Sequence, residues 1–266
     1  MNILKKSLAP VTDKAWEEIE LQSERVLREY LTARQISDIN GPNGIELGAV
    51  STGRLIIPPD QSGEGINYGI REVIPLVELR KPFTLDLWEL DNASRHAVDI
   101  DLENLEKAAR QVASFEDDFL FHGFEGTHTP GMIRAMKGKP VKISVNVDDF
   151  IRTVAEQVGA LKRDSVEGPY ALVMPDKIWS KLVSQHSGYP LSRQLKEIIE
   201  GPIIMHHSNK EIFLASTRGG DFELVLGQDI SLGYEGHDTK KVKLYLTESF
   251  TYRILSPEAY RVIQPA

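Results

Sequence analysis

Residues 41–71 restrict the possible folds of this chain more than any other stretch. Glycines and prolines interrupt it throughout: Gly41, Gly44, Gly48, Gly53, Gly63, Gly65, Gly69, Pro42, Pro58 and Pro59. The strand-like pieces between them, such as Leu47–Val50 and Leu55–Ile57, are short, so the segment cannot bury a core of its own. A loop of this length is usually functional or completed by a neighbour. We therefore predict an extended two-stranded arm that pairs with an adjacent subunit.

The composition around this arm is that of a soluble globular protein. The chain has 266 residues, of which 41% are hydrophobic and 26% charged, so it can form one large domain or two connected ones. Its net charge of −8 argues against nucleic acid as a partner. Cysteine is absent, which excludes disulfides and thiolate metal sites and favours a reducing cytoplasm. Neither a signal core nor a run of about 18 apolar residues is present, so we expect no membrane association.

Hydrophobic periodicity predicts an α+β protein. We expect an amphipathic helix over 13–34, a strand over 75–88, a long helix over 101–122 and a compact α/β unit over 141–215. Two short strands, 241–247 and 249–255, are expected to pair with each other. The helix over 13–34 either packs on its own core or also supplies a groove for a partner peptide.

Ser216–Tyr234 resembles a motif but contains no catalytic machinery. Its charged residues have no His or Cys neighbour to activate: Arg218, Asp221, Glu223 and Asp229. Its glycines punctuate strand-like runs, as tight turns or close backbone packing require: Gly219, Gly220, Gly227 and Gly233. The stretch predicts a specified backbone geometry and no active site.

No catalytic or metal-binding motif stands out elsewhere. The chain has no GxSxG elbow, no phosphate-binding P-loop and no GxGxxG fingerprint. His122 and His128 flank a glycine-rich turn with Glu125 between them, without the i, i+4 spacing of a helical metal site. His206 and His207 end a strand and should point to opposite faces. We therefore expect four ordinary histidines, no metal, no catalytic residues and no enzymatic activity.

Several segments spread over the whole chain resemble one family. They are Leu8–Ile19, Pro82–Asn92, Phe115–Asp118 with Phe121–Gly123, Glu167–Tyr170, Gly188–Pro190 and Thr217–Tyr234. Together and in this order they are similar to the first family of encapsulins, also called linocin-type bacteriocins, which are shell proteins of nanocompartments. The resemblance implies the fold of the tailed-phage major capsid protein.

That resemblance also implies a division of the chain. Residues 1–42 would hold the N-terminal helix and the start of a peripheral domain, and 43–72 the extended loop between subunits. Residues 73–131 would continue the peripheral domain with its spine helix, and 132–218 would form the axial domain. Residues 219–266 would return to the peripheral domain.

The implied function is enclosure of a guest protein. Such chains form closed icosahedral shells, here of the T=1 type with about 60 copies of the chain. They capture a dye-decolourising peroxidase or a ferritin-like protein through a short C-terminal targeting peptide. By position the peptide would dock on Leu27, Leu31, Ile36, Asp38 and Ile230. A secreted bacteriocin or protease, and a prophage capsid protein, are the alternatives.

Two further sites follow from the resemblance. The loop at the five-fold pore would comprise Ser184, Gln185, His186, Ser187, Gly188 and Tyr189. There His186 either tunes passage with pH or is a solvated loop residue. Trp88 matches the position of an aromatic residue that binds flavin in some members, since an indole can stack on the flavin ring. No cofactor is required for the shell itself.

Overall fold

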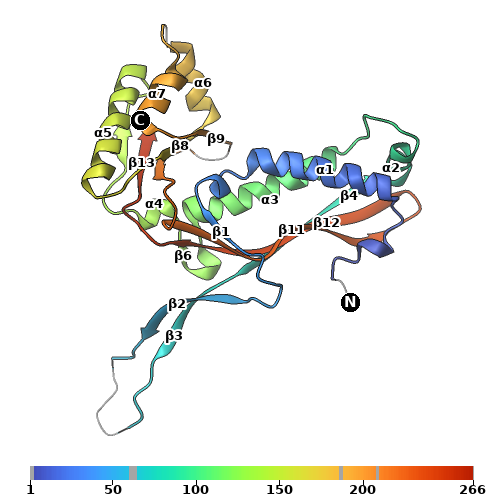
Figure 1. Ribbon diagram of the computed structural model, residues 1–266. Helices are drawn as coiled ribbons and strands as arrows, with labels where there is room; N and C mark the ends of the chain where they lie inside the picture. The colour runs from blue at the N-terminus through green and yellow to red at the C-terminus, as the bar shows by residue number, and fades with distance from the viewer. Residues whose placement is uncertain (1–2, 60–64, 186–187, 208–209, 266) are drawn as a thin grey trace.

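The protein is described by a computed structural model that covers residues 3–59, 65–185, 188–207 and 210–265. Helices and strands are mixed, as predicted for an α+β protein. Figure 1 shows an elongated molecule with three parts: a long sheet covered by helices, a compact unit at one end, and a two-stranded arm that projects from the sheet. We call these parts the peripheral domain, the axial domain and the arm.

The peripheral domain is a four-stranded sheet with helices on one face. The strand order is β1–β11–β12–β4, and α1 and α3 lie side by side above it (Figure 1). Its elements are η1 (Lys6–Leu8), α1 (Asp13–Tyr30), η2 (Ala33–Gln35), β1 (Asp38–Asn40), β4 (Val77–Asp86), α2 (Leu87–Ser94), α3 (Glu103–His122), β11 (Phe222–His237) and β12 (Lys241–Ile254).

Helix α1 ends four residues earlier than the sequence predicts. It begins at Asp13, where Oγ1 of the N-cap Thr12 accepts the N–H of Ala15 at 3.3 Å. Beyond Tyr30 the N–H groups of Thr32 and Ala33 donate instead to the buried carboxylate of Asp117 on α3, at 3.1 and 2.8 Å. This carboxylate satisfies the backbone in place of another helical turn, and η2 follows.

The axial domain is built on a five-stranded sheet of order β7–β13–β10–β8–β9. Every residue of its inner strand β8 (Tyr170–Pro175) is buried. The remaining elements are α4 (Met132–Ala135), β7 (Val141–Ile143), α5 (Val147–Arg163), α6 (Asp176–Gln185), α7 (Leu191–Ile199), β9 (Ile203–His206), β10 (Ile212–Ser216) and β13 (Tyr260–Pro265). The short β5 (Gly123–Phe124), η3 (Glu125–Thr127) and β6 (Thr129–Pro130) join the two domains.

Two expectations for the C-terminal region need correction. Strand β13 does not return to the peripheral sheet with the rest of 219–266; it lies between β10 and β7 in the axial sheet, with Val262 opposite Phe213. The expected pair 241–247 and 249–255 is a single strand, β12. Glu248 falls between the two predicted strands, but its side chain is buried on Arg34 and the strand continues through it.

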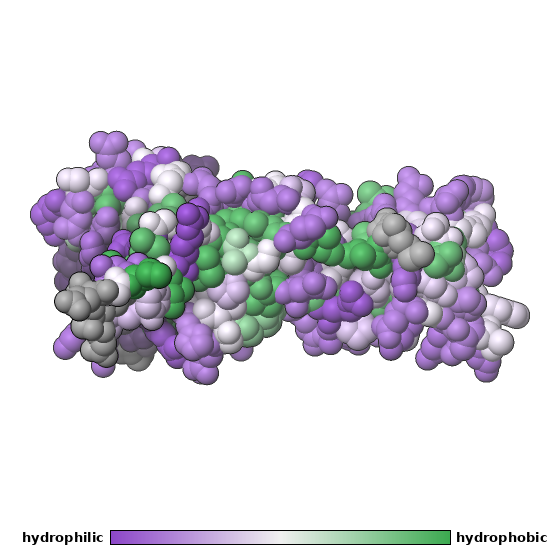
Figure 2. Space-filling view, turned by 90° about the horizontal axis from the view of Figure 1, so that it is seen from below, coloured by the Kyte–Doolittle hydropathy of each residue, from purple (hydrophilic) through white to green (hydrophobic). Residues whose placement is uncertain are grey.

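The predicted two-stranded arm is present. Strands β2 (Ala49–Ile56) and β3 (Ile70–Pro75) pair antiparallel, with Ala49 opposite Pro75. Seven of the apolar side chains in this segment are at least half exposed: Leu55, Ile56, Ile57, Ile66, Tyr68, Ile70 and Val73. Figure 2 shows apolar residues along the middle of the face that includes the arm. A two-stranded hairpin is marginally stable alone. Pairing of the arm with a neighbour stays a prediction.

The glycines of Ser216–Tyr234 have the backbone roles that the sequence predicts. Gly219 and Gly220 have φ of +88° and +80° in the turn before β11, a conformation that suits glycine. Gly227 and Gly233 allow close packing, since a Cβ at Gly233 would lie 2.2 Å from the Tyr245 ring. The stretch shapes the entry into the peripheral sheet.

Candidate functional site

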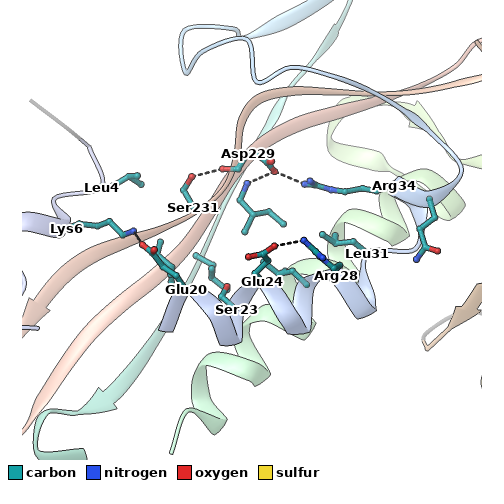
Figure 3. A pocket seen from close by; sticks show the side chains of 15 residues that line it. Leu4, Lys6, Glu20, Ser23, Glu24, Arg28, Leu31, Arg34, Asp229 and Ser231 are labelled. Carbon is teal, nitrogen blue, oxygen red and sulfur yellow. Dashed lines mark hydrogen bonds and ion pairs between the residues drawn. The ribbon is translucent and has the colours of Figure 1, made fainter. Parts of the chain in front are cut away.

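A cavity of about 580 Å³ lies between α1 and β11, and Leu4 and Lys6 close one side of it (Figure 3). We call it the α1–β11 groove. It is lined by Leu4, Lys6, Glu20, Ser23, Glu24, Leu27, Arg28, Leu31, Arg34, Gln35, Asp229, Ile230, Ser231, Leu232 and Leu246.

Helical spacing and a β-bulge together create the apolar wall of the groove. Leu27 and Leu31 are four residues apart and lie one above the other on the same side of α1 and its C-cap. On the opposite side, the pairing of β11 with β12 shifts register between Gln228 and Ser231. Such a bulge re-aims the side chains within it, and here Asp229 and Ile230 line the groove.

Three of the five predicted docking residues lie in this groove and two do not. Leu27, Leu31 and Ile230 line it. Ile36 is only 6% exposed and belongs to the hydrophobic core shared with the axial domain. Asp38 lies on β1, where its Oδ2 accepts the N–H of Gly220 and thereby fixes the turn before β11. Its carboxylate therefore has a structural partner within the chain.

The charged side chains of the groove are paired with one another. Lys6 pairs with Glu20, Arg28 with Glu24 at 2.5 Å, and Arg34 with Asp229 at 2.9 Å. Arg34 also binds the buried Glu116 and Glu248 behind the groove wall, so Asp229 is not its sole counter-charge. The apolar wall of the groove suits a segment with apolar side chains.

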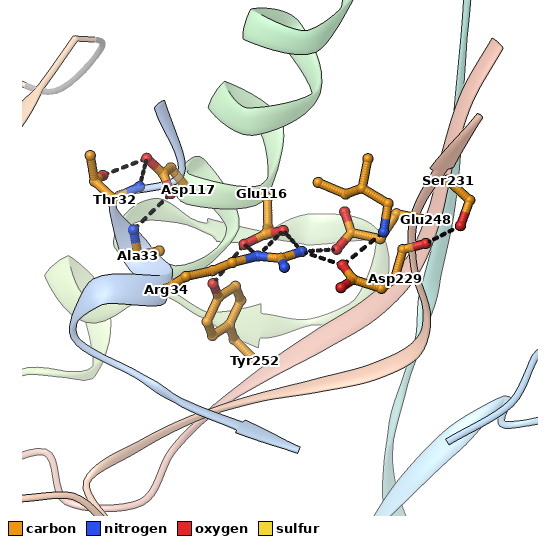
Figure 4. A network of polar contacts seen from close by, with 10 residues as sticks. Thr32, Ala33, Arg34, Glu116, Asp117, Asp229, Ser231, Glu248 and Tyr252 are labelled. Atoms are coloured by element: carbon orange, nitrogen blue, oxygen red, sulfur yellow. Dashed lines mark hydrogen bonds and ion pairs between the residues drawn. The ribbon is translucent and has the colours of Figure 1, made fainter. Parts of the chain in front are cut away.

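One end of the groove is formed by a buried ionic network centred on Arg34 (Figure 4). Its guanidinium makes a bidentate contact with Glu116 of α3: Nε lies 3.0 Å from Oε1, and Nη2 lies 2.7 Å from Oε2. Nη2 also lies 2.8 Å from Oε1 of Glu248 and 2.9 Å from Oδ1 of Asp229. The hydroxyl of Tyr252 donates to Glu116 at 3.1 Å. The network links η2, α3, β11 and β12.

Burial perturbs the titration of this network. The pKa of Glu248 is raised well above its usual range, first by desolvation and then by the neighbouring Glu116. Desolvation also raises the pKa of the Tyr252 hydroxyl well above its usual range, so it remains a hydrogen-bond donor. The pKa of Arg34 is raised by its carboxylate partners despite burial.

Sequence reasoning missed Arg34 as a groove residue and read Asp229 only as a charge in the C-terminal motif. Helical spacing from Leu27 and Leu31 could have suggested Glu20 and Ser23 on the same face of α1. No local pattern could have joined Arg34 to Asp229, because the two residues are 195 positions apart in the chain.

Trp88 lies at a second, more polar cavity of about 540 Å³. Its side chain is 78% exposed, on α2, whose first turn is capped by the Asp86 carboxylate. Arg95 and Lys241 contribute cationic groups to the same cavity. Asp86, Glu89 and Asp101 line the cavity as well, so its two cations are accompanied by three carboxylates around the exposed indole.

The predicted pore loop is described in part. Ser184 and Gln185 end α6, and Gly188 has φ of +108° with open space where a Cβ would lie. Tyr189 is 48% exposed, and its hydroxyl donates to Glu197 at 2.9 Å. His186 and Ser187 lie outside the described residues.

The four histidines do not come together. His206 ends β9 and is buried, whereas His207, the next residue, is partly exposed beside the Tyr30 ring. His122 lies 3.3 Å from Asp118, whose hydrogen bond raises the pKa of the imidazole. Across the described ranges no three His, Cys, Asp or Glu side chains form a metal-binding group. No helix in those ranges is long and apolar enough to cross a membrane.

Comparison with known proteins identifies the family. The family model described as "Encapsulating protein for peroxidase" matches residues 1–251. A type 1 encapsulin shell protein of Rhodospirillum rubrum is 38% identical, over 97% of this chain and 95% of the relative. One from Mycolicibacterium paratuberculosis is 36% identical, over 97% and 98%. The chain belongs to the encapsulin family.

Solved structures agree on the fold. The virus-like particle from Pyrococcus furiosus matches with a TM-score of 0.60 at 20% identity, over 93% of this chain and 98% of that one. The capsid of Myoviridae phage XM1 matches with a TM-score of 0.54 at 13% identity, over 89% and 92%. This encapsulin chain therefore has the tailed-phage capsid fold that the sequence predicts.

Proposed function

We propose that copies of this encapsulin chain assemble into a closed icosahedral shell that encloses a guest enzyme in the cytoplasm. The chain would act as a container and not as an enzyme. A T=1 shell of about 60 copies fits a chain of this length. The arm supports assembly, because its exposed apolar side chains and open strand edges require a cover that a second copy can supply.

The α1–β11 groove carries the proposal for guest capture. Leu27 and Leu31 from α1 face Ile230 from β11 across an apolar cleft, and the surrounding charges are paired. A short C-terminal peptide of the guest would place apolar side chains in this cleft. A dye-decolourising peroxidase or a ferritin-like protein is the guest class that we expect.

Guest loading tests this proposal. The shell chain is co-expressed with a reporter, green fluorescent protein. The C-terminus of this reporter carries about the last 30 residues of the protein that copurifies with the shell. Leu27→Asp buries a charge in the cleft and should abolish loading while particles still form. Leu21→Asp is the matched control, since Leu21 lies on the same helix but is 55% exposed and outside the groove. Normal loading of Leu27→Asp particles would move the docking site elsewhere.

The loop from Ser184 to Tyr189 is proposed to line the pore through which small molecules reach the guest. The exposure of Tyr189 beside α7 supports access of solvent to the described end of this segment. If His186 tunes passage, flux of a small substrate into His186→Ala shells should lose its pH dependence between about pH 5.5 and 8. Unchanged dependence would assign His186 as a solvated residue.

A flavin is proposed as a second ligand, at Trp88. The exposed indole of Trp88 would stack on the ring system, and a bound flavin would supply electron transfer at the shell surface. Riboflavin phosphate added to purified shells should lose fluorescence by stacking on Trp88, and Trp88→Ala should prevent this quenching. Equal quenching by both proteins would argue against the site.

A further inference from the structure

Glu116 and Glu248 are two fully buried carboxyl groups that face a single guanidinium. Their side chains are 0% exposed, and the side chain of Arg34 between them is 15% exposed. Oε2 of Glu248 is buried, and no donor among the described residues reaches it. The pair lies at the end of the α1–β11 groove, where Arg34 and Asp229 are part of the lining (Figures 3 and 4).

The charges of this cluster cannot all be present at once without a large cost. Arg34 supplies one positive charge, whereas Glu116, Glu248 and Asp229 could supply three negative ones. Asp229 is 47% exposed, so water solvates its carboxylate. The two glutamates have no such access, and a buried ion without a neutralising partner costs several kcal/mol. One of the two buried glutamates must therefore be neutral.

The hydrogen bonds indicate which glutamate is ionised. Glu116 accepts from Nε and Nη2 of Arg34 and from the hydroxyl of Tyr252. These donors stabilise a carboxylate, especially the charge-assisted bidentate pair. Glu248 accepts a single Nη2 contact and adjoins the oxygen atoms of Glu116. A carboxylic acid in that position can donate its proton to Glu116.

We propose that Glu116 and Glu248 share one proton, which Glu248 carries. This proton keeps the two carboxyl groups from repelling each other and so keeps Arg34 in contact with Asp229 at this end of the groove. Loss of the proton would place two repelling carboxylates between α3 and β12. Arg34 would be drawn toward Glu248, and its contact with Asp229 on the groove wall would weaken. If the groove docks guests as proposed above, guest docking becomes sensitive to pH.

The titratable and charged groups around Glu248 come from several elements. Arg34 faces it from η2, Glu116 from α3, and Asp229 from β11. The neighbouring strand β4 presents Leu79 opposite Glu248, which does not titrate. On its own strand, Tyr252 binds Glu116, and its raised pKa keeps the hydroxyl neutral. Arg34 is thus the single cation among these groups.

The direction of the pH effect follows from the raised pKa of Glu248. The folded protein holds this proton over a pH range in which the unfolded chain, with a glutamate pKa near 4.5, has lost it. Folding therefore takes up a proton in that range, and stability falls as pH rises. The stabilisation is complete below about pH 4.5 and is lost as pH rises through the folded pKa of Glu248.

Thermal unfolding of the purified full-length protein from pH 5 to pH 9 tests the shared proton without any guest. The amide of Glu248→Gln would stay neutral at every pH, so the melting temperature of this variant minus that of wild type should increase with pH, by about 3 °C or more. Glu24→Gln is the matched control: Glu24 lines the same groove but is 62% exposed, and its difference should not increase. A constant difference for Glu248→Gln would overturn the proposal.

A measurement on wild type covers the case in which Glu248→Gln fails to fold. The infrared carbonyl band of a neutral carboxylic acid should remain at pH 7, where exposed carboxyl groups are ionised. Its absence at pH 7 would overturn the shared proton.

The effect on docking has its own readout. Wild-type particles loaded with the fluorescent reporter should retain several-fold less of it once the pH exceeds the range in which the infrared band shows the proton on Glu248, whereas Glu248→Gln particles should retain equal amounts throughout. Equal loss from both proteins would overturn pH control of docking. If the α1–β11 groove is not the docking site, Leu27→Asp particles would take up the reporter normally. The two hypotheses can therefore be told apart.

Discussion

Nε2 of His206 lies 3.3 Å from Oδ2 of Asp117, and both side chains are 2% exposed. His206 ends β9 of the axial sheet, and Asp117 lies on α3 of the peripheral domain, so this contact joins the two domains. The same carboxylate accepts the N–H groups of Thr32 and Ala33, the residues just before Arg34. One buried aspartate therefore positions the axial domain, the end of α1 and the start of the ionic network.

We predict that His206→Ala destabilises the protein by about 2–4 kcal/mol, because it leaves a cavity and removes a buried polar contact of Asp117. His207→Ala is the matched control: His207 is partly exposed and packs on the Tyr30 ring, so its loss should cost within about 1 kcal/mol. Denaturant unfolding of the two variants measures the difference. Equal losses of unfolding free energy in the two variants would show that the His206 contact does not stabilise the association of the two domains.

We predict that Arg34→Met destabilises the protein by about 3–5 kcal/mol, since it leaves Glu116 and Glu248 without their cation. The triple variant Arg34→Met, Glu116→Gln, Glu248→Gln leaves neither the cation nor an ionisable carboxyl group at these positions and should regain most of that loss. Thermal and denaturant unfolding report both values. If the triple variant is as unstable as the single one, the cost comes from lost packing of Arg34 and not from unpaired charge.

We predict that Gly233→Ala costs about 1–3 kcal/mol through overpacking. The new methyl group would lie 2.2 Å from a ring atom of Tyr245, which is itself 2% exposed and confined by its neighbours. Gly236→Ala, on the same strand, has nothing within 4 Å of its added carbon and should change stability by less than about 0.5 kcal/mol. Similar stabilities of the two variants, compared by denaturant unfolding, would contradict the close packing of β11 on β12.

The long elements and the arm could be predicted because their signals are local. Helix α3 follows a stripe of apolar residues at helical spacing, and the glycines and prolines of 41–71 indicate an arm from the sequence alone. Gly219, Gly220 and Gly233 likewise have the turn or packing roles that their positions suggest.

The ionic network could not be predicted because its members meet only in the folded chain. Arg34 and Glu248 are 214 positions apart, and Glu248 falls between the two strands that the sequence predicts. The same burial that makes Glu248 a partner of Arg34 allows β12 to continue as one strand. Strand β13 was misplaced for a similar reason: pairing with β10 rather than with the preceding strands is set by tertiary contacts.

We predict that the double variant Leu55→Asp, Ile57→Asp prevents assembly and leaves the folded subunit intact. Both arm residues are more than half exposed in the single chain, so the substitutions cost little until a neighbour covers them. Burying each side chain contributes about 1.5–3 kcal/mol to a contact, so each contact should weaken by more than about tenfold. Circular dichroism monitors the fold and size-exclusion chromatography the assembly.

Val98→Asp is the control for the arm variant, because Val98 is 100% exposed and lies outside the arm. It should elute as wild type does. Assembly of the arm variant at wild-type concentrations would show that the arm does not hold neighbouring copies together.

Electron microscopy of the purified full-length protein tests the central claim of a closed shell most directly. The account predicts discrete cages of one diameter, with icosahedral symmetry and about 60 copies of the chain. Single subunits, open sheets, or particles that package DNA as a phage capsid does would contradict it.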